Sequence, residues 1–520
     1  MIQSKKAILA IAVAMGLNVS ANAAEFLVKY KNEKAVNNII SMQTESSGLE
    51  VRGLHKAGKL LKVNLPANAK AQARMISSFY ADKNVEYVVP NFKLHAFSTP
   101  VDMKALKTQY ALTKVNAEAA WKRAGNKGSK NVLLAVIDTG VDYKHKNLAQ
   151  NMVPGFDFRD NDADPMDLTS QQNPGHGTHC AGIVGATGLV DGGTQGMSPE
   201  VSIMPLRFLG ADGSGDLDGG VKAIDYAISK NVQVISASWG ASVPLSTAKP
   251  LVEAIQRAEQ AGIIFVTAAA NDGKNNDTTE VYPANAGTAN MITVAASDSS
   301  DNKPQWSNYG KAKVSLAAPG DAIISTLPGD KYDNLSGTSM ATPLVAGMVA
   351  FLKAQDPKLT GAEVRSLLQV TGAKVKIETA CNCRVDALSA VDTLLAQKAW
   401  MVPAAATIDV NATLQMNMKN AKGAVTFVSS DTNIATVNAA GLLTGTKEGT
   451  VTVKATDASG NSVSTLDINV GKVASSNPGN PGNPPGGPTD PGTPGQCPLG
   501  DQALCDVICK IMPTAPFCAR

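Results

Sequence analysis

Between residues 100 and 398, short runs of consecutive apolar residues alternate with segments of helical pattern. Clear examples of such runs lie at 132–137, 201–206, 232–237 and 263–268. A strand that is apolar along its whole length is buried on both faces, which is typical of a parallel sheet covered by helices. Catalytic groups in such a sheet lie beyond the carboxyl ends of the strands. We therefore predict an α/β domain with its functional site along that edge.

Smaller units flank this region on both sides. Residues 24–97 are expected to form a small α/β sandwich, with helices near 35–42 and 69–80 and strands near 26–30, 50, 60–65 and 85–90. Residues 401–471 are expected to form a small antiparallel sandwich, with strands near 425–430, 434–437, 450–455 and 466–470. Because 520 residues exceed what one hydrophobic core normally serves, several folded units are expected.

The N-terminal 23 residues have the pattern of a signal peptide. Lys5 and Lys6 precede an apolar stretch from 7 to 19, and Ala21-Asn-Ala23 is a small-x-small cleavage site. The alternative is a membrane helix, but the stretch is too short to span a bilayer comfortably, and no later segment has the length of a span. We expect a secreted protein, located outside the cell or in the periplasm or cell envelope.

The proline and glycine content of residues 472–495 predicts a linker, and residues 496–520 form a tail after it. An exported chain permits disulfides, so two are favoured in the tail over a zinc site, with the pairing left open among Cys497, Cys505, Cys509 and Cys518. Cys381 and Cys383 can pair with each other, which would leave Cys180 as a free thiol. The net charge of +3 argues against a large nucleic-acid-binding face.

A serine at the start of a buried helix is the first candidate catalytic group. Ser339 lies in Gly337-Thr-Ser-Met-Ala-Thr-Pro343, and apolar residues continue to Phe351. A simple helix cap would explain the serine alone, but not the small residues on both sides of the hydroxyl. A helix N-terminus also directs backbone N–H groups and a positive dipole at a developing oxyanion.

Such a serine needs a base and a carboxylate that orients the base. His176 in His176-Gly-Thr-His-Cys-Ala-Gly182 is the candidate base, and His179 on the same turn is its competitor. A metal site is the alternative for the two histidines, but no Glu-x-x-His pattern supports it. Asp138 ends an apolar strand and is well placed to orient the base. Their order along the chain, Asp, His, Ser, is the order of the subtilisins themselves.

Together with Val136-Ile-Asp-Thr-Gly140, these blocks resemble the three signature blocks of the subtilase family. The cysteine at Cys180 is similar to that of the thermitase and proteinase K branches. The resemblance implies a subtilisin-like parallel sheet flanked by helices at 98–400. It also identifies 24–97 as a subtilisin-type inhibitor and chaperone propeptide, and 401–471 as a bacterial Ig-like group 2 domain with a β-sandwich fold.

The same resemblance implies a serine endopeptidase whose triad is Asp138, His176 and Ser339. Ser339 would attack the peptide carbonyl, His176 would transfer the proton, and Asp138 would orient the imidazole. Asn271 would donate its side-chain amide to the oxyanion. The family commonly has glycine before this asparagine, where this sequence has Ala270.

Substrate-binding residues also follow from the resemblance. Two segments would hold the substrate backbone as strands, and they contain Ser238, Trp239, Gly240, Gly213 and Gly215. The specificity pocket would include Val281, where the family commonly has glycine. We therefore expect a shallower pocket that prefers medium apolar side chains to large aromatic ones.

Calcium is the expected structural cofactor. The crowded acidic loop resembles a calcium loop of thermitase and contains Asp157, Asp160, Asp162, Asp164 and Asp167. The alternative is a solvated acidic loop without a metal. At the family's usual tight site, Asn147 replaces the common aspartate.

These expectations define a monomeric, self-maturing secreted protease of broad specificity. Its partners would be protein or peptide substrates and its own propeptide, with a maturation site between His95 and Thr99. The competing hypothesis is an inactive subtilase that serves as a binding protein through its Ig-like and cysteine-containing parts.

Overall fold

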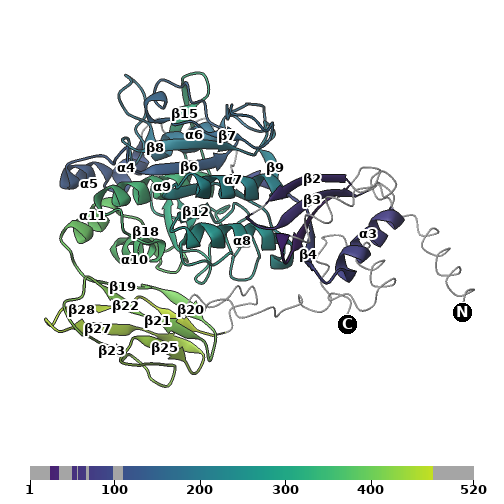
Figure 1. Cartoon of the computed structure of the whole chain (residues 1–520). Helices are drawn as coiled ribbons and strands as arrows, with labels where there is room; N and C mark the ends of the chain where they lie inside the picture. The colour runs from purple at the N-terminus through teal and green to yellow at the C-terminus, as the bar shows by residue number, and fades with distance from the viewer. Residues whose placement is uncertain (1–23, 34–49, 56, 66–68, 98–108, 472–520) are drawn as a thin grey trace, which may run out of the picture. The chain divides into compact units, whose positions relative to one another are not determined.

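The computed structural model describes residues 24–33, 50–55, 57–65, 69–97 and 109–471 (Figure 1). The expected signal peptide, the helix expected at 35–42, the linker and the tail with its four cysteines lie outside the described residues.

The N-terminal unit is a four-stranded antiparallel sheet in the order β2-β3-β1-β4, with one described helix, α3 (Ala69–Ala81). Its strands are β1 (Ala24–Tyr30), β2 (Glu50–His55), β3 (Leu60–Leu65) and β4 (Val85–Pro90). Helix α3 packs against β3 and β4, and Ala73, Ile76 and Phe79 recur on its buried face at a spacing of three. The expected small α/β unit is thus present in the structure.

A nine-stranded sheet, in the order β17-β18-β14-β13-β12-β10-β6-β8-β7, forms the centre of the large domain. All neighbouring strands run parallel except β17 and β18. The central strands are buried along their whole length, as the apolar runs predict. The strands are β6 (Leu133–Asp138), β7 (Phe156–Asp157), β8 (Ser202–Arg207), β10 (Val234–Ala237), β12 (Ile264–Ala268), β13 (Met291–Ser297), β14 (Leu316–Pro319), β17 (Ala373–Lys374) and β18 (Cys383–Arg384).

Helices flank this sheet (Figure 1). Helix α9 (Thr338–Gln355) is buried over its first sixteen residues and packs against β10, β12, β13, β14 and α6 (His176–Gly185). A hairpin of β15 (Ile323–Leu327) and β16 (Lys331–Leu335) also contacts α6 through β15. The other helices are α4 (Tyr110–Lys114), α5 (Ala117–Ala124), η2 (Ala149–Asn151), α7 (Leu217–Ser229), α8 (Leu245–Gln260), α10 (Gly361–Thr371) and α11 (Ala387–Leu395).

The third part is a β-sandwich with its own core, which includes Met416, Leu443 and Val453. The single strand expected at 450–455 is two strands in two sheets, because the chain changes sheet at Thr452. One pair, β20 with β29, is parallel rather than antiparallel. The strands are β19 (Trp400–Val402), β20 (Ala406–Ile408), β21 (Thr413–Gln415), β22 (Asn417–Lys419), β23 (Val425–Ser429), β24 (Ala435–Val437), β25 (Leu442–Gly445), β26 (Gly449–Val451), β27 (Val453–Asp457), β28 (Ser462–Ser464) and β29 (Ile468–Val470).

Cys381 and Cys383 form a disulfide in the structure, and Cys180 is a buried free thiol. None of the helices in the described residues combines the length and the apolarity needed to cross a membrane.

Candidate active site

Asp138 and His176 meet at the carboxyl edge of the parallel sheet. Asp138 ends β6, and its Oδ1 accepts hydrogen bonds from the Thr139 N–H and from Nδ1 of His176, each at 2.7 Å. His176 begins α6, where the Asn173 side chain accepts from its backbone N–H at 2.8 Å and so fixes the helix start. Because a carboxylate can only accept, Nδ1 carries the proton. Nε2 is buried without a partner among the described residues and is therefore the basic nitrogen.

The two candidates for the catalytic base, His176 and His179, both lie on α6 but have different surroundings. Burial lowers the pKa of His176, but the charge and hydrogen bond of Asp138, together with the neighbouring Cys180, outweigh burial and raise that pKa well above its usual value. His179 is also buried, but its Nε2 donates to the Asp333 carbonyl at 3.0 Å. Burial lowers the pKa of His179 to about 3, so this ring stays neutral. Of the two histidines on α6, His176 is the one with a carboxylate partner.

Hydrogen bonds with Ser238 and Cys180 hold Ser339 in place. Ser339 is the second residue of α9, and its hydroxyl donates to the Ser238 carbonyl at 2.9 Å. Pro343 has no N–H and cannot make the usual helical bond to the carbonyl four residues earlier, which is that of Ser339. This carbonyl instead accepts from the Ser238 hydroxyl at 3.0 Å and from the Cys180 thiol at 3.5 Å.

The Cys180 thiol lies between the base and the serine. Its Sγ is 3.9 Å from Nδ1 of His176 as well as 3.5 Å from the Ser339 carbonyl oxygen. Burial raises the pKa of this thiol, so it remains protonated and acts as a donor. Cys180 is thus a buried free thiol beside His176, as expected from the pairing of Cys381 with Cys383.

Asn271 follows β12 and is held by the residue that precedes the serine. Its Oδ1 accepts from the Thr338 backbone N–H at 2.9 Å and from the Thr338 hydroxyl at 2.8 Å. The Thr338 hydroxyl also accepts from the Ala270 N–H at 3.2 Å. Ala270 has a φ of +90°, a region that favours glycine, so the alanine is accommodated in a strained conformation. Sequence reasoning identified Asn271 but missed Thr338.

A short strand, β5 (Lys93–Ala96), lies between β9 (Ser214–Asp216) and β11 (Trp239–Gly240) and pairs antiparallel with both. The residue after it, Phe97, has its carbonyl oxygen 2.9 Å from Nδ2 of Asn271. All five residues predicted to bind a substrate backbone lie in or beside the two outer strands: Ser238, Trp239, Gly240, Gly213 and Gly215.

The predicted specificity pocket contains an aromatic ring. The Phe97 side chain packs against buried Ala270, Val281 and Ala284. A Cβ on Gly240 would lie 2.8 Å from Cζ of Phe97, so the glycine leaves the room that the ring needs. We expected Val281 to give a shallower pocket that prefers medium apolar side chains to large aromatic ones; in the structure an aromatic ring packs beside Val281.

The five aspartates predicted to bind calcium are not gathered at one point. Asp157 and Asp160 both pair with Arg207, the last residue of β8. Asp162 accepts from the Asp164 backbone N–H at 2.9 Å, and Asp164 accepts from the Tyr143 hydroxyl at 2.9 Å.

Asp167 is buried, unlike the exposed part of this loop, and lies near Asp138 and His176. Its Oδ1 accepts from the Thr139 hydroxyl at 2.8 Å, and its Oδ2 accepts from the N–H and hydroxyl of Thr178 at 2.9 and 2.6 Å. Thr139 follows Asp138, and Thr178 is two residues after His176. Asp167 therefore connects the two segments that carry Asp138 and His176.

The other possible metal ligands either belong to the site described above or are bound by protein groups. Within the described ranges, the group of His, Cys, Asp and Glu side chains close enough to share an ion is Asp138, His176 and Cys180, which belongs to the site above. Asn147 is engaged by protein groups: its Nδ2 donates to the Thr194 carbonyl at 2.6 Å, and its Oδ1 accepts from the Thr187 hydroxyl at 2.7 Å.

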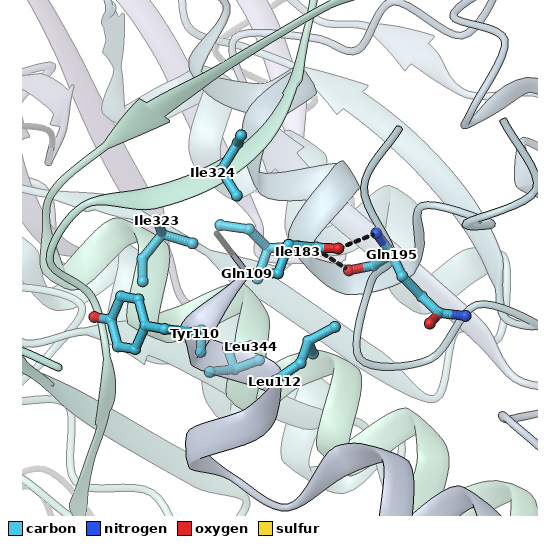
Figure 2. A pocket seen from close by; sticks show the side chains of 9 residues that line it. Gln109, Tyr110, Leu112, Ile183, Gln195, Ile323, Ile324 and Leu344 are labelled. Atoms are coloured by element: carbon cyan, nitrogen blue, oxygen red, sulfur yellow. Dashed lines mark hydrogen bonds between the residues drawn. The ribbon is translucent and has the colours of Figure 1, made fainter. Parts of the chain in front are cut away.

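Figure 2 shows an apolar pocket that sequence reasoning did not identify. Gln109 makes a pair of hydrogen bonds with the backbone of Gln195, at 2.8 and 3.0 Å. Ile183 of α6 and Leu344 of α9 line the pocket and lie on the same helices as His176 and Ser339. Neither His176 nor Ser339 lines it. The pocket is therefore separate from the active-site cluster.

Comparisons with known proteins agree with this geometry. The subtilase family profile matches residues 129–381, and the profile of the bacterial Ig-like domain (group 2) matches 395–468. The chain is 39% identical over 291 residues to the thermophilic serine proteinase of Bacillus sp. (strain AK1), covering 56% of this chain and 68% of that protein. It is 40% identical over 277 residues to thermitase of Thermoactinomyces vulgaris, covering 53% and 92%. The chain therefore belongs to the subtilase family, on its thermitase side, and is a subtilisin-like serine endopeptidase.

Proposed function

We propose that the protein hydrolyses peptide bonds through Asp138, His176 and Ser339. The observation that carries the proposal is the 2.7 Å bond from His176 Nδ1 to Asp138, which leaves the basic Nε2 for the Ser339 hydroxyl. The hydroxyl adds to the substrate carbonyl while Nε2 takes its proton, and the same nitrogen then returns the proton to the leaving amine. Asp138 holds the ring in the required tautomer and stabilises the imidazolium.

Asn271 supports the charged intermediate in this proposal. Because Thr338 engages Oδ1 twice, Nδ2 is directed toward the position of the substrate carbonyl oxygen. The amide is fixed before the reaction begins, so stabilising the oxyanion requires little reorganisation. A substrate would lie as an extended strand between β9 and β11, with an apolar side chain next to Val281 before the scissile bond.

The remaining parts serve maturation and export in this proposal. Residues 1–23 direct secretion, 24–97 form the propeptide that inhibits the enzyme until it cleaves itself, and 98–400 are the catalytic domain. Residues 401–471, 472–495 and 496–520 are the Ig-like domain, linker and tail. We expect a monomer that acts on proteins and peptides outside the cytoplasm.

Calcium is proposed as a structural ion only, and few carboxylates of the acidic loop are available as ligands for it. Arg207 already pairs with Asp157 and Asp160, and threonine donors satisfy Asp167. The five carboxylates thus do not form one cation site, and the proposal is restricted to the exposed side chains of Asp162 and Asp164. No catalytic step depends on the ion.

The function is tested by comparing wild type with Ser339→Ala, and with Ser300→Ala as a control for an exposed serine. Wild type and the control should digest casein and react with a serine-directed phosphonate. Ser339→Ala should do neither, with a loss on the order of 10⁶, the size known for the subtilisin nucleophile itself. A folded wild type that neither cleaves casein nor reacts with the phosphonate would support the alternative, an inactive binding protein.

A further inference from the structure

We propose that Asn308, in the segment between β13 and β14, is a positioning residue for the oxyanion donor Asn271. In this role Asn308 does not bind the substrate carbonyl itself but holds the backbone on both sides of Asn271. The inference rests on the proposed protease function and goes further, since it assigns a role to a buried side chain that the proposed mechanism does not use.

Asn308 is fully buried and contacts the chain both before and after Asn271. Its backbone N–H donates to the Ala270 carbonyl at 3.0 Å. Its side-chain Oδ1 accepts from the N–H groups of Asp272 and Lys274, each at 2.9 Å. The Ala270 carbonyl and the Asp272 N–H belong to the two peptide groups that flank Asn271. One residue therefore holds both of these peptide groups.

The backbone before Asn271 needs this support because its conformation is unfavourable. Ala270 has a φ of +90°, which residues other than glycine rarely adopt. Its N–H donates to the Thr338 hydroxyl at 3.2 Å, while its carbonyl accepts from the Asn308 N–H. A strained conformation persists only where the surrounding bonds hold it. Loss of the Asn308 side chain would leave the turn held by fewer bonds and free to relax.

Asn308 is itself anchored to the central sheet. The Ser307 hydroxyl donates to the Asn308 carbonyl at 3.0 Å and accepts from the N–H of Ala296, in β13, at 2.9 Å. On the other side, Nδ2 of Asn308 donates to Oδ1 of buried Asn276 at 2.9 Å, and Nδ2 of Asn276 donates to the Ala269 carbonyl at 3.0 Å. The turn that carries Asn271 is thus connected to β13 through Asn308.

Asn271 is therefore fixed at both its side chain and its backbone. Thr338 engages the side-chain Oδ1 twice, and Asn308 holds the flanking peptide groups. With both ends held, Nδ2 keeps its direction toward the position of the substrate carbonyl oxygen. A displacement of about 1 Å at such a site can cost about 10²-fold in rate, so the support of Asn308 should appear in the chemical step.

A purely structural role is the alternative, and Asn290 provides the matched control for it. Asn290 is also a buried asparagine, and its Nδ2 donates to the Ile263 carbonyl at 2.7 Å. Ile263 precedes the amino end of β12, whereas Asn271 follows the carboxyl end of the same strand. Asn290→Ala therefore removes a comparable buried amide at the opposite edge of the sheet.

The test measures kcat and KM of Asn308→Ala and Asn290→Ala, each alone and combined with Asn271→Ala. All enzymes are matured in trans by a separable wild type, and the serine-directed phosphonate counts the active sites. Asn308→Ala should lower kcat per site about tenfold or more, with KM within about twofold of wild type. Asn290→Ala should leave kcat within about twofold, even where urea unfolding shows a similar loss of stability. In the Asn271→Ala background, Asn308→Ala should lower kcat by less than about twofold further, because the donor that it positions is gone.

The outcomes separate this inference from the proposed function. If wild type digests casein but Asn308→Ala leaves kcat per site unchanged, or lowers it equally with and without Asn271, the inference is wrong and the function stands. If Asn308→Ala does not fold, Asn308→Ser, which keeps a smaller acceptor, is measured instead and should show the same dependence on Asn271. A folded wild type that is inactive and unreactive toward the phosphonate would refute the proposed function itself.

Discussion

The catalytic cluster and the acidic loop are both groups of polar residues, but they are assembled in opposite ways. Asp138 and His176 are 38 residues apart in sequence and share a 2.7 Å hydrogen bond. The aspartates of 157–167 are close in sequence, yet Arg207 binds two of them and Thr139 and Thr178 bind a third. Proximity in sequence therefore predicts a shared site less well than a common position at the edge of the sheet does.

Parallel topology explains the difference. The carboxyl ends of parallel strands lie along one edge, so residues that follow different strands meet there. Asp138 ends β6, and Asn271 follows β12 by three residues. The side chains of a single loop are not brought to one edge in this way. The carboxylates of this loop are therefore bound by different donors.

After the substitutions of Ser339 and His176, the largest expected effect is at the Asp138 carboxylate. Asp138→Asn should reduce kcat/KM by about 10⁴, the size seen when this carboxylate of a serine protease becomes an amide. Burial lowers the pKa of His176 and the Asp138 charge raises it. Without that charge the pKa falls, so the acid limb of the pH–rate profile should move to lower pH.

The pH–rate profile is measured on enzyme matured in trans by a separable wild type, because the variant will not process itself. An acid limb that stays in place or moves to higher pH would show that Asp138 does not control the charge of the imidazole.

The next effect is at the oxyanion donor. Asn271→Ala should cost about 3–4 kcal/mol of transition-state stabilisation, the loss known for the corresponding asparagine of subtilisin itself. The loss should appear in kcat with little change in KM, because the donor acts mainly on the charged intermediate. An increase in KM with kcat unchanged would instead mean that Asn271 only binds the substrate.

The acidic loop is tested through its buried member. Asp167→Asn places an amide donor opposite donors of Thr178 and Thr139, so it should destabilise the fold by about 1–3 kcal/mol and reduce kcat. Asp164→Asn, at an exposed position of the same loop, should stay within about 0.5 kcal/mol. Urea unfolding and steady-state kinetics measure both variants. Similar losses for both would mean that the loop acts as one unit, as a metal site would.

The smallest expected effect is that of calcium. Because Arg207 engages Asp157 and Asp160, removal of calcium by a chelator should lower the melting temperature only slightly, by less than about 4 °C. The shift should vanish in the double variant Asp162→Asn, Asp164→Asn. A large shift that persists in this variant would place calcium at another site.

The sequence predicted those features that depend on local pattern. Asp138, His176 and Ser339 stand in short blocks at a strand end and two helix starts, and the structure has them at those positions. The sequence also predicts that Pro343 leaves the Ser339 carbonyl without its usual helical donor. It does not predict the donors that replace it, because Ser238 and Cys180 come from distant segments.

Other features depend on register or on long-range packing. The position of Phe97 at Asn271 follows from how β5 aligns with β9 and β11, which no local pattern specifies. The packing of the Phe97 ring could not be predicted from Val281 alone, because Gly240 on a different strand also borders the ring. The change of sheet at Thr452 likewise depends on the partners of β26 and β27.

The central claim, that Asp138, His176 and Ser339 act as one unit, is tested most directly by kcat/KM of Ser339→Ala, His176→Ala and the double variant. Each enzyme is matured in trans by a separable wild type. The account predicts that each single variant loses on the order of 10⁶, as in subtilisin itself, and that the double variant loses no more. Losses that multiply in the double variant would contradict it, because the two residues would then act independently.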